Sequence, residues 1–181
     1  VDPGAAAFTA NTAPVIAANG ATITVNEGTT ASNSGAISDG EGDPVTLNAT
    51  VGTVVNNNDG TWSWSYAASD GPAESSLVTI TADDGNGGVS HTSFALIVNN
   101  VAPTISAVTN SGPLASSGSA TINVSASDSA GANDPLTYAF DCNNDGTFEV
   151  GPQPGNSVTC TFTSAGQFPV NVQVRDDDGD M

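Results

Sequence analysis

Alternation of polar and apolar side chains with a period of two is the feature that most constrains the fold of this sequence. It runs through Thr22–Val25, Thr61–Tyr66, Leu77–Thr81 and Phe168–Val174. Such alternation is typical of strands that bury one face and expose the other to water. No segment has the i, i+3, i+4, i+7 apolar spacing of an amphipathic helix. Turn dipeptides such as Asp59-Gly60 separate the candidate strands, and the sequence therefore predicts an all-β protein.

An internal repeat divides the chain. Asn11–Ile16 (N-T-A-P-V-I) recurs as Asn100–Ile105 (N-V-A-P-T-I), so that the two Ala-Pro motifs are 89 residues apart. This spacing is about the length of one immunoglobulin-like sandwich. We therefore expect two tandem Ig-like antiparallel β-sandwiches, at residues 11–100 and 101–181, joined by a short linker that contains a proline.

Both repeats also resemble known families. The second contains Asp134–Asp141 (D-P-L-T-Y-A-F-D) and Ala165–Asp176 (A-G-Q-F-P-V-N-V-Q-V-R-D), and on these residues it resembles a PKD domain. It departs from that family at Cys142–Gly146 (C-N-N-D-G), where Gly-Asp-Gly is usual. The first contains Asp59–Trp64 (D-G-T-W-S-W) and the turn Asp84–Gly88 (D-G-N-G-G), and resembles bacterial Ig-like or cadherin-like repeats of large surface proteins. These resemblances imply extracellular tandem modules of stalks and adhesins, often stiffened by calcium, and they do not imply catalysis.

The second repeat is shorter at its end than the first. In the first, the acidic turn leads into a candidate last strand, Ser90–Val98, whereas the sequence reaches Met181 directly after the acidic turn of the second. Residues 1–10 stand where the last strand of a preceding repeat would stand, and joining two copies end to end would space the Ala-Pro motifs by 92 residues. We therefore expect the second sandwich to lack its final strand.

A strand donated by a neighbouring copy would complete that sandwich. In this head-to-tail assembly the protein is its own partner, and residues 1–10 would supply the strand through their apolar positions Ala5, Ala7 and Phe8. The alternative is that the 181 residues belong to one longer polypeptide with the same repeat. Both alternatives predict a linear structure such as a fibre, sheath, surface layer or adhesin stalk.

The charge balance points to cations. The chain has 19 acidic residues against one basic residue, Arg175, and a formal net charge of −18. This excludes a nucleic-acid binder, and the absence of a run of about 20 apolar residues excludes insertion in a membrane by a helix.

In an Ig-like sandwich the B–C and F–G loops emerge at the end that carries the N-terminal linker. Calcium prefers six to eight oxygen ligands, so we expect calcium at both loop clusters, unless their acidic residues are only solvated turn formers. The candidate ligands are Asn11, Asp39, Glu41, Asp43, Asp83 and Asp84 in the first repeat, and Asn100, Asp128, Asp134, Asp176, Asp177 and Asp178 in the second.

A third acidic cluster contains Asp141, Asn143 and Asp145. It matches the start of an EF-hand loop, but Pro152 occupies the twelfth position, where an EF-hand requires a bidentate Glu. The cluster is therefore not an EF-hand. A local calcium loop and an ordinary hairpin turn both remain open.

The only two cysteines, Cys142 and Cys160, lie in the second repeat. An even count in a chain of extracellular composition favours a disulfide over two buried thiols. A disulfide is also consistent with a location outside the cell or on its surface.

Trp62, Trp64 and Tyr66 share one face of a candidate strand. They could form a platform for a polysaccharide, which would make the chain an accessory carbohydrate-binding module of a secreted hydrolase. The serines on the opposite face favour a core position for the aromatic rings instead. Catalysis has little support, because His91 is the only histidine and no nucleophile motif accompanies it.

Overall fold

The computed structural model describes residues 10–113 and 117–181, so the proposed donor positions Ala5, Ala7 and Phe8 lie outside the described residues. The chain forms two compact units. Unit 1 holds residues up to Val25 together with Thr29–Ala68 and Ser75–Ile97. Unit 2 holds Val98–Met181 and two short segments from earlier in the chain, Asn26–Gly28 and Ser69–Glu74.

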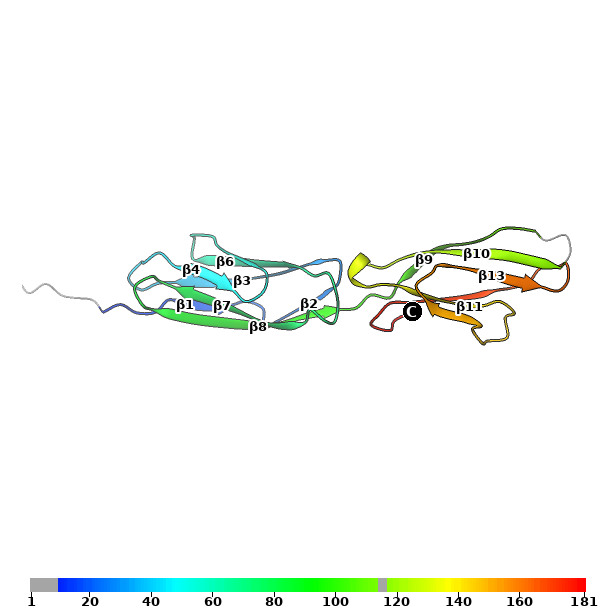
Figure 1. The fold of residues 1–181 in the computed structure, drawn as a ribbon. Coiled ribbons are helices and arrows are strands. Elements are labelled where there is room, and N and C mark those ends of the chain that lie inside the picture. The colour runs from blue at the N-terminus through cyan, green and yellow to red at the C-terminus, as the bar shows by residue number, and fades with distance from the viewer. Residues whose placement is uncertain (1–9, 114–116) are drawn as a thin grey trace, which may run out of the picture. The chain divides into compact units, whose positions relative to one another are not determined.

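Unit 1 is built from two four-stranded antiparallel sheets (Figure 1). One has the order β1-β3-β6-β5, formed by Val15–Ala18, Thr30–Ser38, Thr61–Ala67 and Thr53–Asn56. The other has the order β2-β8-β7-β4, formed by Thr22–Asn26, Val89–Asn99, Ser76–Asp83 and Thr46–Ala49. The strands predicted from the alternating pattern at residues 22–25, 61–66 and 77–81 are confirmed as β2, β6 and β7.

The core of unit 1 is aromatic. Trp62 and Trp64 on β6 are 0% and 2% exposed, and Trp64 packs edge-on against Phe94 of β8 with ring centroids 4.9 Å apart. Ser63 and Ser65, which alternate with the aromatic residues of β6, point the other way, as the period of two requires. Both indole N–H groups donate to backbone carbonyl oxygens, Trp62 to Ala17 and Trp64 to Val51. The two rings are therefore core residues, and their burial opposes the alternative of a sugar-binding platform.

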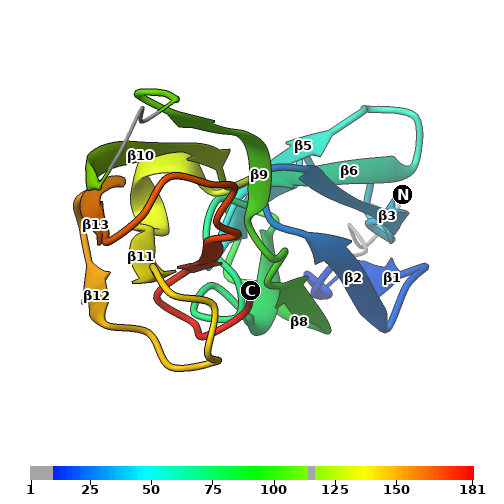
Figure 2. The same ribbon diagram turned by 90° about the vertical axis from the view of Figure 1, so that its right-hand side faces the viewer.

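Unit 2 is built from two three-stranded antiparallel sheets, which can be followed in Figure 2. One has the order β13-β10-β9, formed by Ser157–Phe162, Gly118–Ser127 and Thr104–Asn110. The other has the order β12-β11-β14, formed by Val150–Gln153, Thr137–Asp141 and Asn171–Arg175. A single 3₁₀ turn, η1 (Gly131–Asn133), lies in the connection from β10 to β11.

The core of unit 2 combines Ile122 and Val124 of β10 with Phe140 of β11 and Val174 of β14. The predicted disulfide is confirmed, because Cys142 and Cys160 are bonded and the Cys160 side chain belongs to this core. Together the two units confirm the predicted all-β class of Ig-like sandwiches.

The last predicted strand begins later than its sequence pattern indicated. We expected Phe168–Val174 to be extended, but β14 begins at Asn171. Pro169 has no backbone N–H to contribute to a ladder, which accounts for the late start.

Among the described strands β14 pairs only with β11, whereas the comparable strand of unit 1, β7, lies between β4 and β8. One edge of β14 therefore has no strand beside it in the described part of the chain.

Within residues 10–113 and 117–181, no helical segment has the length and apolarity that crossing a bilayer requires.

Candidate cation site

The predicted ligands of unit 1 gather where the β3–β4 loop and the turn after β7 approach the start of the unit. The Asn11 Nδ2 group donates to Asp84 Oδ2 over 2.9 Å. Within the β3–β4 loop, Asp39 Oδ1 accepts the backbone N–H groups of Glu41 and Asp43, each over 3.0 Å. Most of these polar contacts hold the turns themselves in shape.

Asp84 is well satisfied as a carboxylate. Its Oδ1 accepts the N–H groups of Asn86 and Gly88 over 2.8 and 2.9 Å, in addition to the bond from Asn11. Burial works against ionisation of Asp84, but these hydrogen bonds outweigh it and lower the pKa of the carboxyl. Asp83 accepts the N–H of Gly85 over 2.7 Å. In unit 1 these two carboxylates already have hydrogen-bond donors.

The sequence repeat is reproduced in the atoms of unit 2. Asn100 Nδ2 donates to Asp176 Oδ2 over 3.0 Å, as Asn11 does to Asp84. Asp176 Oδ1 accepts the N–H groups of Gly179 and Asp180 over 2.6 and 2.7 Å. The Asn-x-Ala-Pro motif therefore pairs with the first carboxylate of the acidic turn in both units.

Asp134 is the exceptional carboxylate of unit 2. Its side chain is 0% exposed, its Oδ1 accepts the N–H of Asp177 over 2.9 Å, and its Oδ2 is buried without any hydrogen-bond partner. Asp128 Oδ2 and Asn100 Oδ1 are also buried without partners. In unit 1 Asp39 Oδ2 has the same property. An unsatisfied buried oxygen is costly, so these atoms call for an explanation.

Glu27 joins this group, although the sequence analysis missed it. It follows β2 directly, is 1% exposed, and accepts the N–H of Val101 at Oε1 and that of Gly71 at Oε2, both over 2.9 Å. One carboxylate oxygen each of Glu27, Asp128 and Asp134 lie within 4.8 Å of one another. Sequence spacing gives no signal for Glu27, because about a hundred residues separate it from Asp128. Glu27 was also missed because we predicted ligands only in loops at the end of each sandwich that carries its N-terminal linker.

A glycine allows Glu27 to reach this position. Gly28 has φ +70°, which L side chains rarely adopt, and a Cβ atom there would lie 2.8 Å from the Ser129 carbonyl oxygen. The segment Asn26–Gly28 can therefore lie against the loop that carries Asp128.

The electrostatics of the cluster disfavour its own negative charge. Burial raises the pKa of Asp134 to about 7, together with a hydrogen bond between its side chain and that of Asp177 and the nearby charges of Asp128 and Asp176. The backbone N–H of Asp177 acts in the opposite direction but does not outweigh these effects. Burial, followed by repulsion from neighbouring carboxylates, also raises the pKa of Asp178. The only basic residue of the whole chain, Arg175, donates to Met181 Sδ over 3.4 Å. The cluster therefore contains carboxylates that lack a compensating cation.

The donor set fits a hard cation such as calcium. It offers carboxylate and amide oxygens, the only histidine lies on β8 in unit 1, and both cysteines are bonded to each other. Oxygen-only sites with several carboxylates are typical of calcium rather than zinc. The residues that would hold the ion are Glu27, Asn100, Asp128, Asp134, Asp177 and Asp178.

The third cluster has a different character. Asp141, Asp145 and Glu149 each place an oxygen within 4.8 Å of the others, but Asp141 accepts the N–H groups of Asp145 and Gly146. Burial opposes ionisation of Asp141, yet its hydrogen bonds outweigh this and lower its pKa. Asn143 Oδ1 accepts the Asp145 N–H over 2.8 Å. This network is the one expected of a hairpin turn, while a calcium loop stays a prediction.

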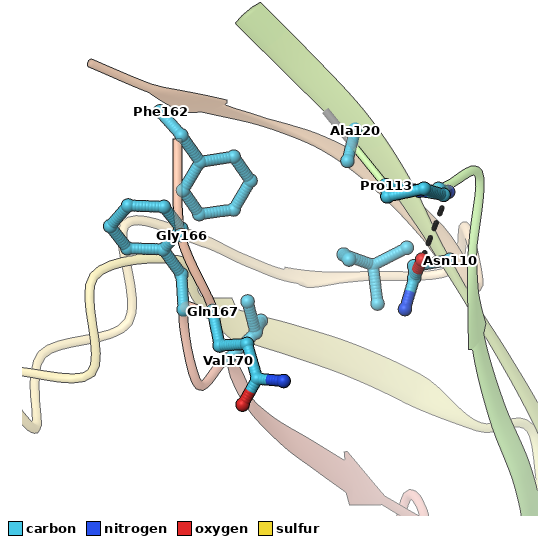
Figure 3. Close-up of a pocket in the computed structure, with 10 residues that line it drawn as sticks. Asn110, Pro113, Ala120, Phe162, Gly166, Gln167 and Val170 are labelled. Atoms are coloured by element: carbon cyan, nitrogen blue, oxygen red, sulfur yellow. Dashed lines mark hydrogen bonds between the residues drawn. The ribbon is translucent and has the colours of Figure 1, made fainter. Parts of the chain in front are cut away.

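A hollow of about 390 Å³ lies near the opposite end of β10 from Asp128 (Figure 3). Phe162 stacks on Phe168 at its wall, with ring centroids 4.9 Å apart. Asn110 Oδ1, across the hollow, accepts the N–H of Gly112 over 2.9 Å. The described residues that line it include no titratable side chain.

The comparisons with known proteins identify both repeats. Residues 11–96 match the family model of the bacterial Ig domain, and residues 100–181 match that of the PKD domain. No curated protein matches the chain significantly.

Several solved structures are similar at low identity. The titin domains Z1Z2 in complex with telethonin are 13% identical, with 93% of this chain and 96% of that chain covered and a TM-score of 0.43. The Ig1–2 module of the Drosophila receptor protein tyrosine phosphatase DLAR is 10% identical, with coverages of 91% and 97% and a TM-score of 0.40. The Yersinia pseudotuberculosis adhesin InvE is 13% identical, with coverages of 92% and 56% and a TM-score of 0.37.

Domains of these two families are typically non-catalytic structural modules, and together with the disulfide they suggest an extracellular protein. The assignment comes from the two family models and agrees with the strand topology of each unit. The chain is a bacterial Ig domain followed by a PKD domain.

Proposed function

We propose that this chain is a calcium-stiffened structural segment of an extracellular stalk, fibre or adhesin. The observation that carries the proposal is Asp134, a fully buried carboxylate with one oxygen unpartnered, among other carboxylates. A divalent cation would supply the missing partner and remove the repulsion among these groups.

The ligands would tie together segments that are distant in sequence. Glu27 continues directly from β2, and Asn100 follows β8 at the start of the linker. Asp128 and Asp134 belong to the connection between β10 and β11, and Asp177 to the turn after β14. An ion bound by these groups would limit movement of the linker against the PKD domain. Stiffness of this kind suits a chain whose work is to hold an extended shape under load.

Length would come from linear continuation at β14. The sheet edge formed by β14 borders a hollow of about 340 Å³, whose apolar lining includes Ile105, Phe148, Val172 and Val174. In unit 1, β8 covers the comparable edge of β7, and its residues Phe94 and Leu96 are buried. A strand with similar alternation would satisfy the unpaired backbone groups of β14. The strand is either a later part of the same polypeptide or residues 1–10 of a neighbouring copy, and the mass of the native chain distinguishes the two.

Thermal unfolding with and without calcium tests the calcium proposal. We expect differential scanning calorimetry to show a higher melting temperature for unit 2 in calcium than in chelator, at equal ionic strength. A potassium salt at the same ionic strength serves as the control for non-specific screening. An unchanged unit 2 transition would refute the proposal, since a ligand that binds only the folded state must stabilise it.

A further inference from the structure

We infer that unit 2 binds two cations side by side and that Asp134 bridges them. The inference rests on the proposed calcium function and specifies its site. Asp134 belongs to two separate groups of carboxylates, one with Glu27 and Asp128 and the other with Asp177 and Asp178. In each group one oxygen from every member lies within 4.8 Å of the other two.

The first position is enclosed. Glu27 and Asp134 are 1% and 0% exposed, and the Oδ2 atoms of Asp128 and Asp134 are buried without hydrogen-bond partners. Glu27 keeps one backbone N–H on each oxygen, which orients its carboxylate and leaves further lone pairs. These unpartnered oxygens point to a bound ligand, and they are evidence independent of the acidic composition. Asn100 Oδ1, also buried and unpartnered, is a further oxygen in the same unit.

The second position is open to solvent. Asp177 and Asp178 are exposed, so water would complete the coordination of an ion held there. Asp134 is the only member of this group that is buried, and its Oδ1 is positioned by the N–H of Asp177. A carboxylate has two oxygens with about four lone-pair sites, which allows one side chain to contact two ions.

Charge balance favours two ions over one. The two groups together contain five carboxylates, Glu27, Asp128, Asp134, Asp177 and Asp178. One divalent ion would leave three of the five negative charges unbalanced, and two would leave one. No lysine exists in the chain to balance the remainder. The exposed members would then bind the second ion more weakly than the enclosed position binds the first.

Counting bound ions in single variants tests the bridge. Native mass spectrometry and calorimetric titration with calcium would be applied to the whole chain and to Asp134→Asn, Glu27→Gln and Asp178→Asn. We expect Asp134→Asn to lose two ions relative to the unmodified chain, and each of the other variants to lose one. The matched control is Asp59→Asn, which removes a carboxylate from a hairpin turn in unit 1 and should lose none.

The outcomes separate the bridge from the calcium function. Loss of one ion or none in Asp134→Asn overturns the bridge but leaves calcium binding intact if the unmodified chain is stabilised by calcium. If the unmodified chain binds no calcium, both proposals fail. Asparagine keeps an oxygen that can accept the Asp177 N–H, so the variant should fold, and a dispersed amide NMR spectrum verifies this. If it does not fold, the double variant of Glu27 and Asp178 decides: loss of two ions supports two positions, and loss of one overturns them.

Discussion

Replacing Asp134 by asparagine should change the stability of unit 2 in opposite directions with and without calcium. Without calcium, the variant removes a buried negative charge that faces Asp128 and Asp176. A buried polar atom without a partner costs about 1–3 kcal/mol, and more when it is charged. Because the amide still leaves one polar atom in place of Oδ2, we expect a gain near the lower limit, about 1 kcal/mol. For a domain of this size that corresponds to a rise of about 4–8 °C in melting temperature.

The gain should depend on pH in a defined direction. The pKa of Asp134 is raised to about 7 from its ordinary value of 3.8, so the folded state binds its proton more tightly than the unfolded state. The calcium-free wild type is therefore most stable below the unfolded pKa, and it loses this stability as pH rises through 7. The variant has no proton to lose at this position. The two proteins should differ at pH 8.5 and converge toward pH 5.

Scanning calorimetry in calcium-depleted buffer at the two pH values, and again with calcium at pH 8.5, measures all of these quantities. Calcium should raise the melting temperature of the wild type and leave the variant nearly unchanged, with Asp59→Asn behaving as the wild type does for unit 2. The reasoning is refuted if the variant is less stable than the wild type without calcium at pH 8.5. It is equally refuted if calcium stabilises both proteins by the same amount.

Three further predictions concern the sandwiches themselves. Changing Cys142 and Cys160 to serine opens the disulfide that closes an 18-residue separation, and should lower the unfolding free energy of unit 2 by about 3 kcal/mol in urea titrations; an unchanged midpoint would contradict this. Trp64→Ala should cost unit 1 about 3–5 kcal/mol because the ring is 2% exposed, and retained stability would mean that the ring is not a core residue. Gly35→Ala should destabilise unit 1 by at least about 1–3 kcal/mol, since a Cβ there would overlap the Ala17 carbonyl oxygen, whereas Gly40→Ala, whose nearest atom is 3.3 Å away, serves as the tolerated control in the same melting assay.

Much of the fold could be predicted because it depends on local pattern. The alternation in β6 placed Trp62 and Trp64 on one face, and a face of large apolar rings has to be buried. The cysteine pair followed from count and composition. The repeated Asn-x-Ala-Pro motif indicated equivalent junctions, and the Asn11–Asp84 and Asn100–Asp176 hydrogen bonds show that they are equivalent in structure.

The candidate site could be predicted only in part, because burial depends on contacts between distant segments. Asp43 and Asp134 both precede a proline in corresponding loops, yet Asp134 is fully buried and Asp43 is not. The difference comes from Glu27 and the turn after β14, which pack around Asp134 in unit 2. Local sequence describes neither the burial nor the orphaned oxygen that results from it.

The most direct test of the account is the distance distribution between one spin label in each unit, measured by pulsed electron paramagnetic resonance with and without calcium. Labels at the exposed positions Ser65 on β6 and Thr159 on β13, introduced through a non-natural amino acid to spare the disulfide, report motion between the units. We predict a distance distribution that is narrow in calcium and broad in chelator. A magnesium-free potassium buffer of equal ionic strength serves as the control, and it should not restore the narrow distribution. Distributions of equal width in the two conditions would contradict calcium stiffening.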